Sequence, residues 1–486
     1  MCRWFDSAPG HQGLPCKNAN PCGWRFCFNV RQTPRPVYFR LRFGNAKIPA
    51  YSLVCCQNSG LEPGSGPGFR AERTVQVVEE DVSVLVDKVF EPVMLSERPY
   101  PHYVKYMGSK SKIMDFVLDG INSVYTGGVV CDLFAGSASL AGAIGHQVAV
   151  HSNDIQVYSE VLAQAYLVGY RYPGMPSAEE ILTAAEKIVR KKSAAWQSVI
   201  FDYKQSISLK EFTALEIAQQ NLITGEFKGK WHLFTKYYSG TWWSVEQCLW
   251  IDAIRAECEK FRGTSSFPVL LASLMYAMAY TSQGTGHYAQ YRDAKTESSL
   301  NDIIIYRRRS LANYFRRKYD EVASALPSER PDFQHKTTSL DFRDCLKGVS
   351  GGTVYADPPY CFVHYSRFYH AIETLVLYDY PSIQEKGGRV VKGRYRESRH
   401  QSPFCIASQV KKAFSDLFSG VMTSGASLVL SYSNNGMITI DEIEQLLLDY
   451  CPTKTVEIVL TNHQHMTLGR QNDRHRNVEE CLFLVQ

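Results

Sequence analysis

The feature that most constrains the fold is a strand–turn–helix–strand pattern that lies before residue 155. Val129 to Phe134 is an apolar run too short for a helix, and we predict a buried strand there. Small residues follow, a helix is expected over Ser139 to Ile144, and a second strand over Gln147 to His151 leads to Asn153–Asp154. Two strands joined by a helix within about 25 residues begin a parallel α/β unit, because parallel neighbours need a crossover connection.

The same alternation returns in the last third of the chain. Short apolar runs at Val354 to Ala356 and Ser427 to Tyr432 predict two further buried strands. A helix is expected over Asp441 to Tyr450, and strand-like runs follow at Thr455 to Thr461 and Val478 to Val485. We therefore predict that the early and the late strands form one sheet.

The residues between these two parts have a helical pattern. Charged residues recur every three or four positions over Glu179 to Lys192, Ser244 to Arg262 and Arg307 to Leu326. The uncharged stretch Phe267 to Thr281 is too short to span a bilayer and is predicted to be a buried helix. We expect an α/β, Rossmann-like sheet domain made of residues 76–157 and 336–486, with a mostly helical insertion at residues 158–335.

The first 75 residues differ in composition from the rest of the 486-residue chain. They hold ten Lys or Arg and three acidic residues, a net charge of +7. The remaining 411 residues carry 43 basic and 45 acidic groups, a net charge of −2. Six prolines before residue 50 and a Gly-rich stretch, Gly60 to Phe69, predict a poorly ordered basic extension. An accessory nucleic-acid-binding arm and a non-native leader are the alternatives.

The distribution of the cysteines indicates the cellular compartment and argues against a metal centre. Six of the fourteen cysteines lie within the first 56 residues, and the others are scattered singly. Cys16, Cys22 and Cys27 lack the spacing that is typical of zinc ligands, so we predict no metal site. Scattered cysteines fit a reducing compartment, and the first residues do not resemble a signal peptide. We expect a cytoplasmic protein without a membrane segment.

The chemistry is concentrated in Asp357, Pro358, Pro359 and Tyr360, which directly follow the predicted strand at Val354 to Ala356. In a parallel sheet this position is a rigid loop at the carboxyl edge, where ligands bind. An aryl amine attacks poorly because its lone pair is delocalised into the ring. A carboxylate and a proline-directed carbonyl, each accepting one N–H, would draw the lone pair out of conjugation, and the aromatic ring could stack on a base. An ordinary Pro-rich turn is the alternative interpretation.

A second constellation, Asp132 to Ser139, covers the end of the first predicted strand and the turn after it. The small residues of this turn let a ligand approach the backbone just before a helix begins. By itself the turn fits a plain tight turn equally well. An acid about 20 residues further on, Asp154, is where ribose hydroxyls are held in dinucleotide-binding and related folds, and this spacing favours a nucleotide-type ligand.

Four motifs occur in one order along roughly residues 100–486: Lys105 to Lys110 (KYMGSK), Phe134 to Ser137, Asn153–Asp154, and Asp357 to Tyr360. This order resembles the DNA adenine-N6 methyltransferases of the Dam type, in which the target-recognition region lies between the Gly-rich turn and the catalytic tetrapeptide. The resemblance implies that an adenine of double-stranded DNA is flipped into the pocket. It also implies that the methyl group of S-adenosylmethionine passes to N6 by direct in-line displacement, without a metal.

The resemblance assigns roles to individual residues. The catalytic loop that it implies is Asp357, Pro358, Pro359 and Tyr360. The residues that it places at the cofactor are Tyr106, Lys110, Phe134, Ala135, Gly136, Ser137, Asp154, Asp341, Phe342 and Asp357. Two positions depart from the family pattern, because Gly108-Ser109 replaces a double glycine and Ala138 stands where a second glycine is commoner. Ala and Ser are small, so cofactor binding is still expected.

The predicted DNA contacts come from local basic residues. A Gly-rich segment soon after the catalytic motif favours a clamp on the DNA backbone, and its basic residues are Lys386, Arg389, Lys392, Arg394, Arg396 and Arg399. Lys105, beside the target base by resemblance, and Arg292, in the polar and aromatic loop Gly284 to Arg292, complete the set. That loop fits a plain surface loop as well, and the basic run Arg307 to Lys318 fits a solvated helix face. The aromatic cluster Tyr237, Tyr238, Trp242 and Trp243 is predicted to be core.

Three other functions fit parts of the pattern. A cytosine-N4 methyltransferase uses the same geometry, although its tetrapeptide more often begins with Ser than with an acid such as Asp357. An RNA adenine methyltransferase and a catalytically idle DNA-binding subunit of a defence assembly are the other two. We find no nuclease motif, so a cognate restriction endonuclease would be a separate partner.

Overall fold

The computed structural model describes residues 39–42, 94–284, 287–360, 362–466 and 475–486, and for 39–42, 462–466 and 475–479 the backbone alone. The chain divides into two compact units, and all described residues belong to the unit formed by Tyr38–Phe43 and Pro92–Gln486. The predictions for the N-terminal extension, including Cys16, Cys22 and Cys27, lie outside the described residues, apart from one short strand.

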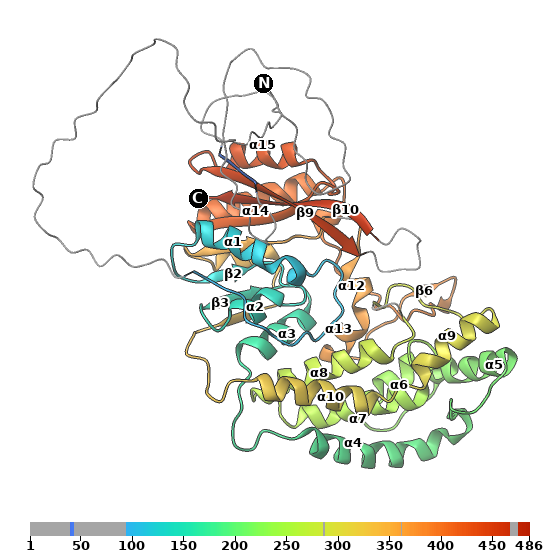
Figure 1. The fold of residues 1–486 in the computed structure, drawn as a ribbon. Coiled ribbons are helices and arrows are strands. Elements are labelled where there is room, and N and C mark those ends of the chain that lie inside the picture. The colour runs from blue at the N-terminus through green and yellow to red at the C-terminus, as the bar shows by residue number, and fades with distance from the viewer. Residues whose placement is uncertain (1–38, 43–93, 285–286, 361, 467–474) are drawn as a thin grey trace, which may run out of the picture. The chain divides into compact units, whose positions relative to one another are not determined.

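An eight-stranded sheet forms the centre of this unit, with strand order β1-β9-β10-β8-β5-β2-β3-β4 (Figure 1). Its strands are β1 Phe39–Arg42, β2 Val130–Asp132, β3 Val150–Asn153, β4 Lys336–Thr338, β5 Thr353–Ala356, β8 Ser427–Ser433, β9 Val456–Met466 and β10 His475–Val485. Strands β8, β5, β2, β3 and β4 are parallel, whereas β10, β9 and β1 are antiparallel. The prediction that strands from both ends of the sequence share one sheet is confirmed.

Both faces of the sheet are covered by helices. One face packs on α1 Met114–Val124, α2 Ser139–Ile144 and α3 Val157–Leu167, and the other on α11 Phe342–Lys347, α14 Val410–Ser424 and α15 Ile440–Tyr450. Successive strand residues alternate between the two cores: Tyr355 and Val429 face the first, whereas Val354 and Leu428 face the second. β2, β5 and β8 are buried on both sides, so these strands read as largely apolar runs.

The described elements between α3 and β4 are all helical, and Figure 1 draws them gathered beside the sheet. They are α4 Ala178–Ser193, η2 Ala194–Val199, α5 Leu209–Gln220, η3 Asn221–Thr224, α6 Leu233–Tyr238, α7 Val245–Glu259, α8 Ser266–Thr281, α9 Glu297–Arg307 and α10 Leu311–Ala325. Ser–Glu or Ser–Gln capping boxes begin α4, α5 and α7. The buried helix predicted at Phe267 to Thr281 is α8, and Tyr238, Trp242 and Trp243 are fully buried, as predicted for the aromatic core.

A segment that follows the catalytic motif also packs on these helices. It contains α12 Tyr365–Phe368, α13 His370–Leu377 and the hairpin strands β6 Glu385–Lys386 and β7 Arg389–Val390. The Trp242 indole N–H donates to the carbonyl of Gly393 at 2.9 Å, and Arg255 Nε donates to the carbonyl of Leu375 at 3.0 Å. The helices between α3 and β4 are therefore also held by a segment that follows β5 in the sequence.

Two predicted element bounds differ from the structure for local reasons. The second strand begins at Val150, not at Gln147, because the Gln147 and Val148 N–H groups still bond to the Ile144 carbonyl at the end of α2. The helix predicted over Arg307 to Leu326 is interrupted, because Ser310 caps a new helix by accepting the Asn313 N–H. Short 3₁₀ turns, η1 Lys110–Ile113 and η4 Pro403–Cys405, complete the described helices. Among the described helices, none has both the length and the apolar character needed to cross a bilayer.

Candidate active site

A cavity of about 600 Å³ lies at the carboxyl ends of β2, β3 and β5. This is the edge at which ligands bind in open parallel sheets, and the volume is in the range of small-molecule sites. All residues predicted for the cofactor and the catalytic loop contribute to its lining: Tyr106, Lys110, Phe134, Ala135, Gly136, Ser137, Asp154, Asp341, Phe342, Asp357, Pro358, Pro359 and Tyr360. Five segments far apart in the sequence thus meet at one place.

The turn after β2 explains why small residues are needed there. Gly136 has a φ of +53°, and a Cβ at this position would lie 2.8 Å from the Tyr106 ring, which packs over the turn. Ala138 has a φ of +56° and directly precedes α2. A left-handed conformation costs a residue with a Cβ about 1–2 kcal/mol. The position at which the family more often has a second glycine is therefore one where Ala is strained.

Asp154 holds this turn to the end of β3. Its Oδ2 accepts the Gly136 N–H at 2.9 Å, and its Oδ1 accepts the Gln156 N–H at 2.9 Å. Burial raises the pKa of Asp154, whereas the backbone N–H groups of Gln156 and Gly136 act to lower it. Asp154 lines the cavity, and a carboxylate accepts more than two hydrogen bonds, which suits a ligand that donates hydroxyl hydrogens.

Asp132, at the end of β2, is a buried carboxylate in the cavity wall. Its Oδ1 accepts no hydrogen bond from the described residues. Burial raises the pKa of Asp132 well above its usual value, and the nearby carboxylates of Asp357 and Asp154 raise it further. A buried oxygen without a donor is costly, so this position favours a ligand that brings a positive charge or an N–H. Sequence reasoning placed Asp132 in the turn motif but gave it no role.

The predicted catalytic loop, residues 357–360, contacts a buried cluster of charged side chains. Lys110 Nζ lies 3.3 Å from Asp357 Oδ1 and 3.0 Å from Glu480 Oε2. The Tyr360 hydroxyl donates to Glu480 Oε1 at 3.0 Å. Burial acts to lower the pKa of Lys110, but Asp357 and Glu480 outweigh it and raise that pKa, so the ammonium stays charged at neutral pH. The Asp357 side chain, 17% exposed, keeps a fixed orientation toward the cavity.

Sequence reasoning missed Glu480. It lies on β10, 120 residues after Tyr360, and its side chain is 0% exposed. No motif marks it, but one signal was available. Glu479 and Glu480 directly precede the apolar run Cys481–Val485, and an acid at the start of a buried strand needs a partner.

The predicted DNA-binding residues divide into exposed and internally bonded groups. Lys386, Arg389 and Lys392 are exposed, and Lys392 pairs with Asp293 at 2.7 Å. Arg394 is 4% exposed and donates to the carbonyl of Gln220 at 3.2 Å. Burial lowers the pKa of Arg394 to about 10. This side chain is therefore not on the surface that a clamp needs.

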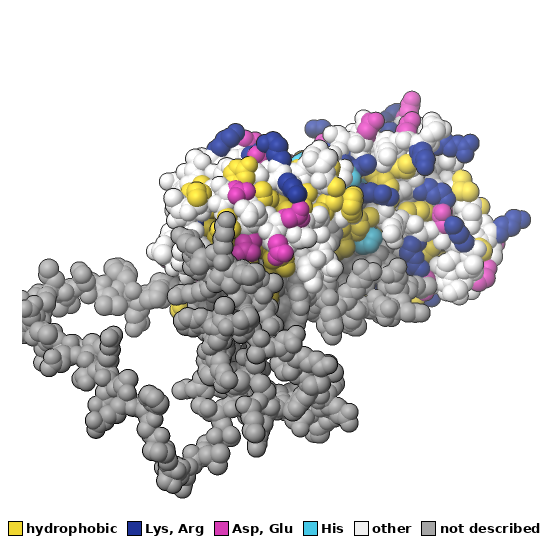
Figure 2. Space-filling model, turned by 90° about the horizontal axis from the view of Figure 1, so that it is seen from above, with side chains coloured by type: hydrophobic (Ala, Val, Ile, Leu, Met, Phe, Trp, Pro, Cys, Tyr) yellow, Lys and Arg dark blue, Asp and Glu magenta, His cyan; other side chains and the backbone are white. Residues whose placement is uncertain are grey.

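The remaining predicted DNA contacts are also partly engaged within the protein. Arg396 pairs with Asp379 at 2.6 Å, and Arg399 donates to the Arg396 carbonyl. Arg292 pairs with Asp302 at 3.0 Å, and Lys105 is exposed with its Nζ 4.2 Å from the centre of the Tyr280 ring. Figure 2 shows more Lys and Arg than Asp and Glu on the right-hand part of the face it draws.

Two exposed residues beside the catalytic loop were not predicted. Phe362 is 83% exposed, two positions after Tyr360. Arg367 is exposed, and both Arg367 and Arg399 lie over the ring of Tyr395. In the predicted base-contact loop, by contrast, Tyr288 is 2% exposed and packs on Trp242 and Trp243, so this aromatic ring belongs to the core.

The chain matches the family model of the D12 class N6 adenine-specific DNA methyltransferases over residues 106–426, and it belongs to that family. It is 25% identical over 394 residues to the type II methyltransferase M.FokI of Planomicrobium okeanokoites, covering 79% of this chain and 52% of that protein. The modification methylase LlaI of Lactococcus lactis subsp. lactis is 25% identical over 377 residues, 76% of this chain and 52% of that protein.

A third relative, the type II methyltransferase M.NlaIII of Neisseria lactamica, is 23% identical over 354 residues. That match covers 71% of this chain and 87% of the relative. The chain therefore spans about half the length of the first two relatives and most of the third.

Proposed function

We propose that the protein methylates the N6 amine of adenine in double-stranded DNA, with S-adenosylmethionine as the methyl donor. The observation that carries this proposal is the Asp357 carboxylate, which is fixed by Lys110 at the carboxyl edge of β5 inside the cavity. Membership of the family supports adenine over cytosine as the target base.

The cavity residues fit the chemical groups of this cofactor. The unsatisfied, buried Oδ1 of Asp132 suits an ammonium, and Asp154 suits ribose hydroxyls. The rings of Phe134 and Phe342, with centroids 5.7 Å apart, provide an apolar place for an adenine ring. When bound, S-adenosylmethionine supplies a methyl group that its sulfonium already activates, so no metal is required.

The catalytic loop would act on the target amine. Asp357 and the Pro358 carbonyl each accept one N–H, which turns the amine lone pair away from the ring and toward the methyl donor. Lys110 and Glu480 hold Asp357 and Tyr360 in place, so Tyr360 can stack on the flipped base without a change of position.

We assign DNA recognition to the helical part of the chain and to the surface beside the catalytic loop. The division proposed is a catalytic domain of residues 76–157 and 336–486 and a recognition insertion of residues 158–335. α3, which includes the first ten residues of that predicted insertion, packs on the sheet, so we propose to move its start from residue 158 to the residue after Leu167. Exposed Lys386, Arg389 and Arg367 would supply phosphate contacts. Arg292, Arg394 and Arg396, which bond to groups within the protein, would hold that surface in place.

Restriction–modification is the biological setting that we propose. Two relatives are named as type II methyltransferases and one as a modification methylase. A partner endonuclease would cut only the unmethylated site, so methylation by this chain would protect the DNA of its own cell.

The test is methyl transfer from tritiated S-adenosylmethionine to duplex DNA of mixed sequence. We expect the wild-type chain to label duplex DNA, and Asp357→Ala to lose at least about 100-fold in rate while keeping cofactor affinity within about threefold. Labelling that RNA competes away would favour an RNA substrate instead. Absence of transfer to any DNA would indicate an idle DNA-binding subunit, and an active Asp357→Ala would contradict the role of the loop.

A further inference from the structure

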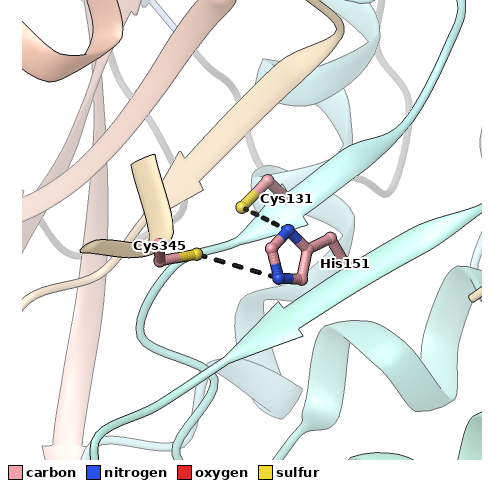
Figure 3. Close-up of side chains that lie close together, drawn as sticks. All are labelled: Cys131, His151 and Cys345. Atoms are coloured by element: carbon pink, nitrogen blue, oxygen red, sulfur yellow. Dashed lines mark hydrogen bonds between the residues drawn. The ribbon is translucent and has the colours of Figure 1, made fainter. Parts of the chain in front are cut away.

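Three metal-ligating side chains meet behind the cavity, on the face of the sheet covered by α11. Cys131 comes from β2, His151 from β3 and Cys345 from α11, as Figure 3 shows. Both sulfur atoms and a ring nitrogen lie within 4.8 Å of one another. Cys131 Sγ is 3.9 Å from His151 Nδ1, and Cys345 Sγ is 3.8 Å from Nε2. All three residues are at most 5% exposed.

A chain of hydrogen bonds determines which nitrogen of His151 is free to bind a ligand. The Asn153 amide donates to the carbonyls of Leu133 and Leu340, so its Oδ1 is the acceptor for the Thr338 hydroxyl at 2.8 Å. With its hydrogen used, Thr338 Oγ1 must accept from His151 Nε2–H, 3.0 Å away. His151 Nδ1 is then unprotonated and faces Cys131. A histidine ligand usually has this arrangement, because a bond from one nitrogen fixes the other for the metal.

We propose that Cys131 Sγ, Cys345 Sγ and His151 Nδ1 bind a thiophilic cation of the Zn²⁺ or Cu⁺ type. Soft sulfur donors with an imidazole select these ions. Zinc–sulfur and zinc–nitrogen bonds of about 2.3 and 2.0 Å put the donor atoms roughly 3.5–3.8 Å apart, so donor atoms that now lie up to 4.8 Å apart need to approach by about 1 Å.

The charge balance suits a buried position. Each thiol releases one proton as its metal–sulfur bond forms, so Zn²⁺ with two thiolates and a neutral imidazole has no net charge. A neutral site avoids the cost of burying an uncompensated ion. Three protein donors complete a trigonal Cu⁺ site, or leave one position of the zinc tetrahedron for a solvent molecule.

The position of the cluster gives the metal a structural role for the cavity. Cys131 directly precedes Asp132, His151 lies shortly before Asp154, and Cys345 lies on the helix that begins at Phe342. A metal would therefore tie together three segments that line the cavity. This consequence for cofactor affinity rests on the proposed function, whereas metal binding itself does not.

The test uses the full chain in which the six N-terminal cysteines, Cys2, Cys16, Cys22, Cys27, Cys55 and Cys56, are changed to Ser, so that they cannot supply the metal site. We expect elemental analysis of the reduced protein to find about one Zn or Cu per chain, and the element found distinguishes the two ions. Co²⁺ added to metal-free protein should give a sulfur-to-cobalt charge-transfer band and intense visible bands.

Matched variants locate the site. Cys131→Ser and Cys345→Ser should each weaken Co²⁺ binding at least 100-fold, whereas Cys451→Ser, which changes another buried cysteine, should leave it unchanged. If the variants fail to fold, the metal content and the cobalt spectrum of the parent protein still decide. Absence of Zn, Cu and Co²⁺ binding, binding that survives both cluster variants, or a Cys131–Cys345 disulfide in the protein as purified would each overturn the proposal.

Discussion

The predicted catalytic loop at 357–360 and the basic segment at 386–399 were both identified from their residue types. They differ in which groups their charged side chains contact. Asp357 is held from two distant elements, by Lys110 directly and by Glu480 through Lys110. In the basic segment, Arg394, Arg396 and Arg399 direct their guanidinium groups to partners within the protein. In this chain the rigid motif is a better guide to the site than the run of like charges. Charged residues that are close in sequence can have different roles, because some are buried and bond within the protein while others are exposed.

The largest effect is expected for Lys110→Met, which tests whether the loop depends on its buried cation. The change leaves the Asp357 and Glu480 carboxylates without a counter-charge, so the free energy of unfolding should fall by about 3–5 kcal/mol and methylation should be lost. Urea unfolding followed by circular dichroism, together with methyl transfer, measures both. Lys112→Met, an exposed change in the same turn, should cost less than about 0.5 kcal/mol. If the two variants lost the same stability and the same activity, the loop would not depend on the buried Lys110.

The basic segment gives the next prediction. Arg394→Ala should lower the free energy of unfolding by about 2–4 kcal/mol, because it removes a buried side chain and leaves the Gln220 carbonyl without its donor. The double variant Lys386→Ala/Arg389→Ala should leave stability unchanged but reduce the slope of log affinity for DNA against log salt by about 2. Salt-dependent DNA binding and chemical unfolding separate the two roles. If Arg394→Ala instead reduced the salt dependence of DNA binding and left stability unchanged, Arg394 would contact the DNA.

A third prediction concerns the residue that sequence reasoning missed. Glu480→Gln preserves shape but removes the charge that holds Lys110, and it leaves one acceptor oxygen where Lys110 and Tyr360 each use one. We expect kcat to fall about 10–100-fold while cofactor affinity changes less than about threefold, because the loop is misplaced and the rest of the cavity is intact. Steady-state kinetics and equilibrium cofactor binding give the two numbers. Glu457→Gln, a partly exposed change on β9, is the control. A loss confined to cofactor affinity would indicate that Glu480 supports the cofactor and not the loop at 357–360.

The smallest effect is expected for Asp132→Asn, and it has opposite signs for stability and binding. Burial raises the pKa of Asp132 in the folded chain, so charging it opposes folding. That penalty is absent below the unfolded pKa near 4 and grows as the pH rises. Asn should therefore increase the free energy of unfolding by about 1 kcal/mol at pH 8 and by less at pH 5, while cofactor affinity falls about tenfold. Equal stability gains at both pH values would contradict the titration of Asp132.

Much of the fold followed from local pattern, and the reason is visible in particular strands. β2, β5 and β8 are buried on both faces, so their apolar runs identify them without any neighbour. The pocket lining followed as well, because Asp154 and Asp357 end such strands and must lie at one edge.

What the sequence did not predict depends on partners that are distant along the chain. Glu480 reaches Lys110 across 370 positions, and Cys131 on β2 meets Cys345 on α11, with the whole helical part between them in the sequence. The burial of Arg394 depends on α5, whose last turn provides the accepting carbonyl of Gln220. None of these contacts leaves a local signature of spacing or periodicity.

Identification of the methylated base tests the central claim most directly. Duplex DNA is treated with the wild-type chain or with Asp357→Asn, digested to nucleosides and analysed by mass spectrometry. The account predicts N6-methyladenine from the wild type and none from Asp357→Asn, with cofactor affinity retained in both. N4-methylcytosine, or equal N6-methyladenine from the two proteins, would contradict it.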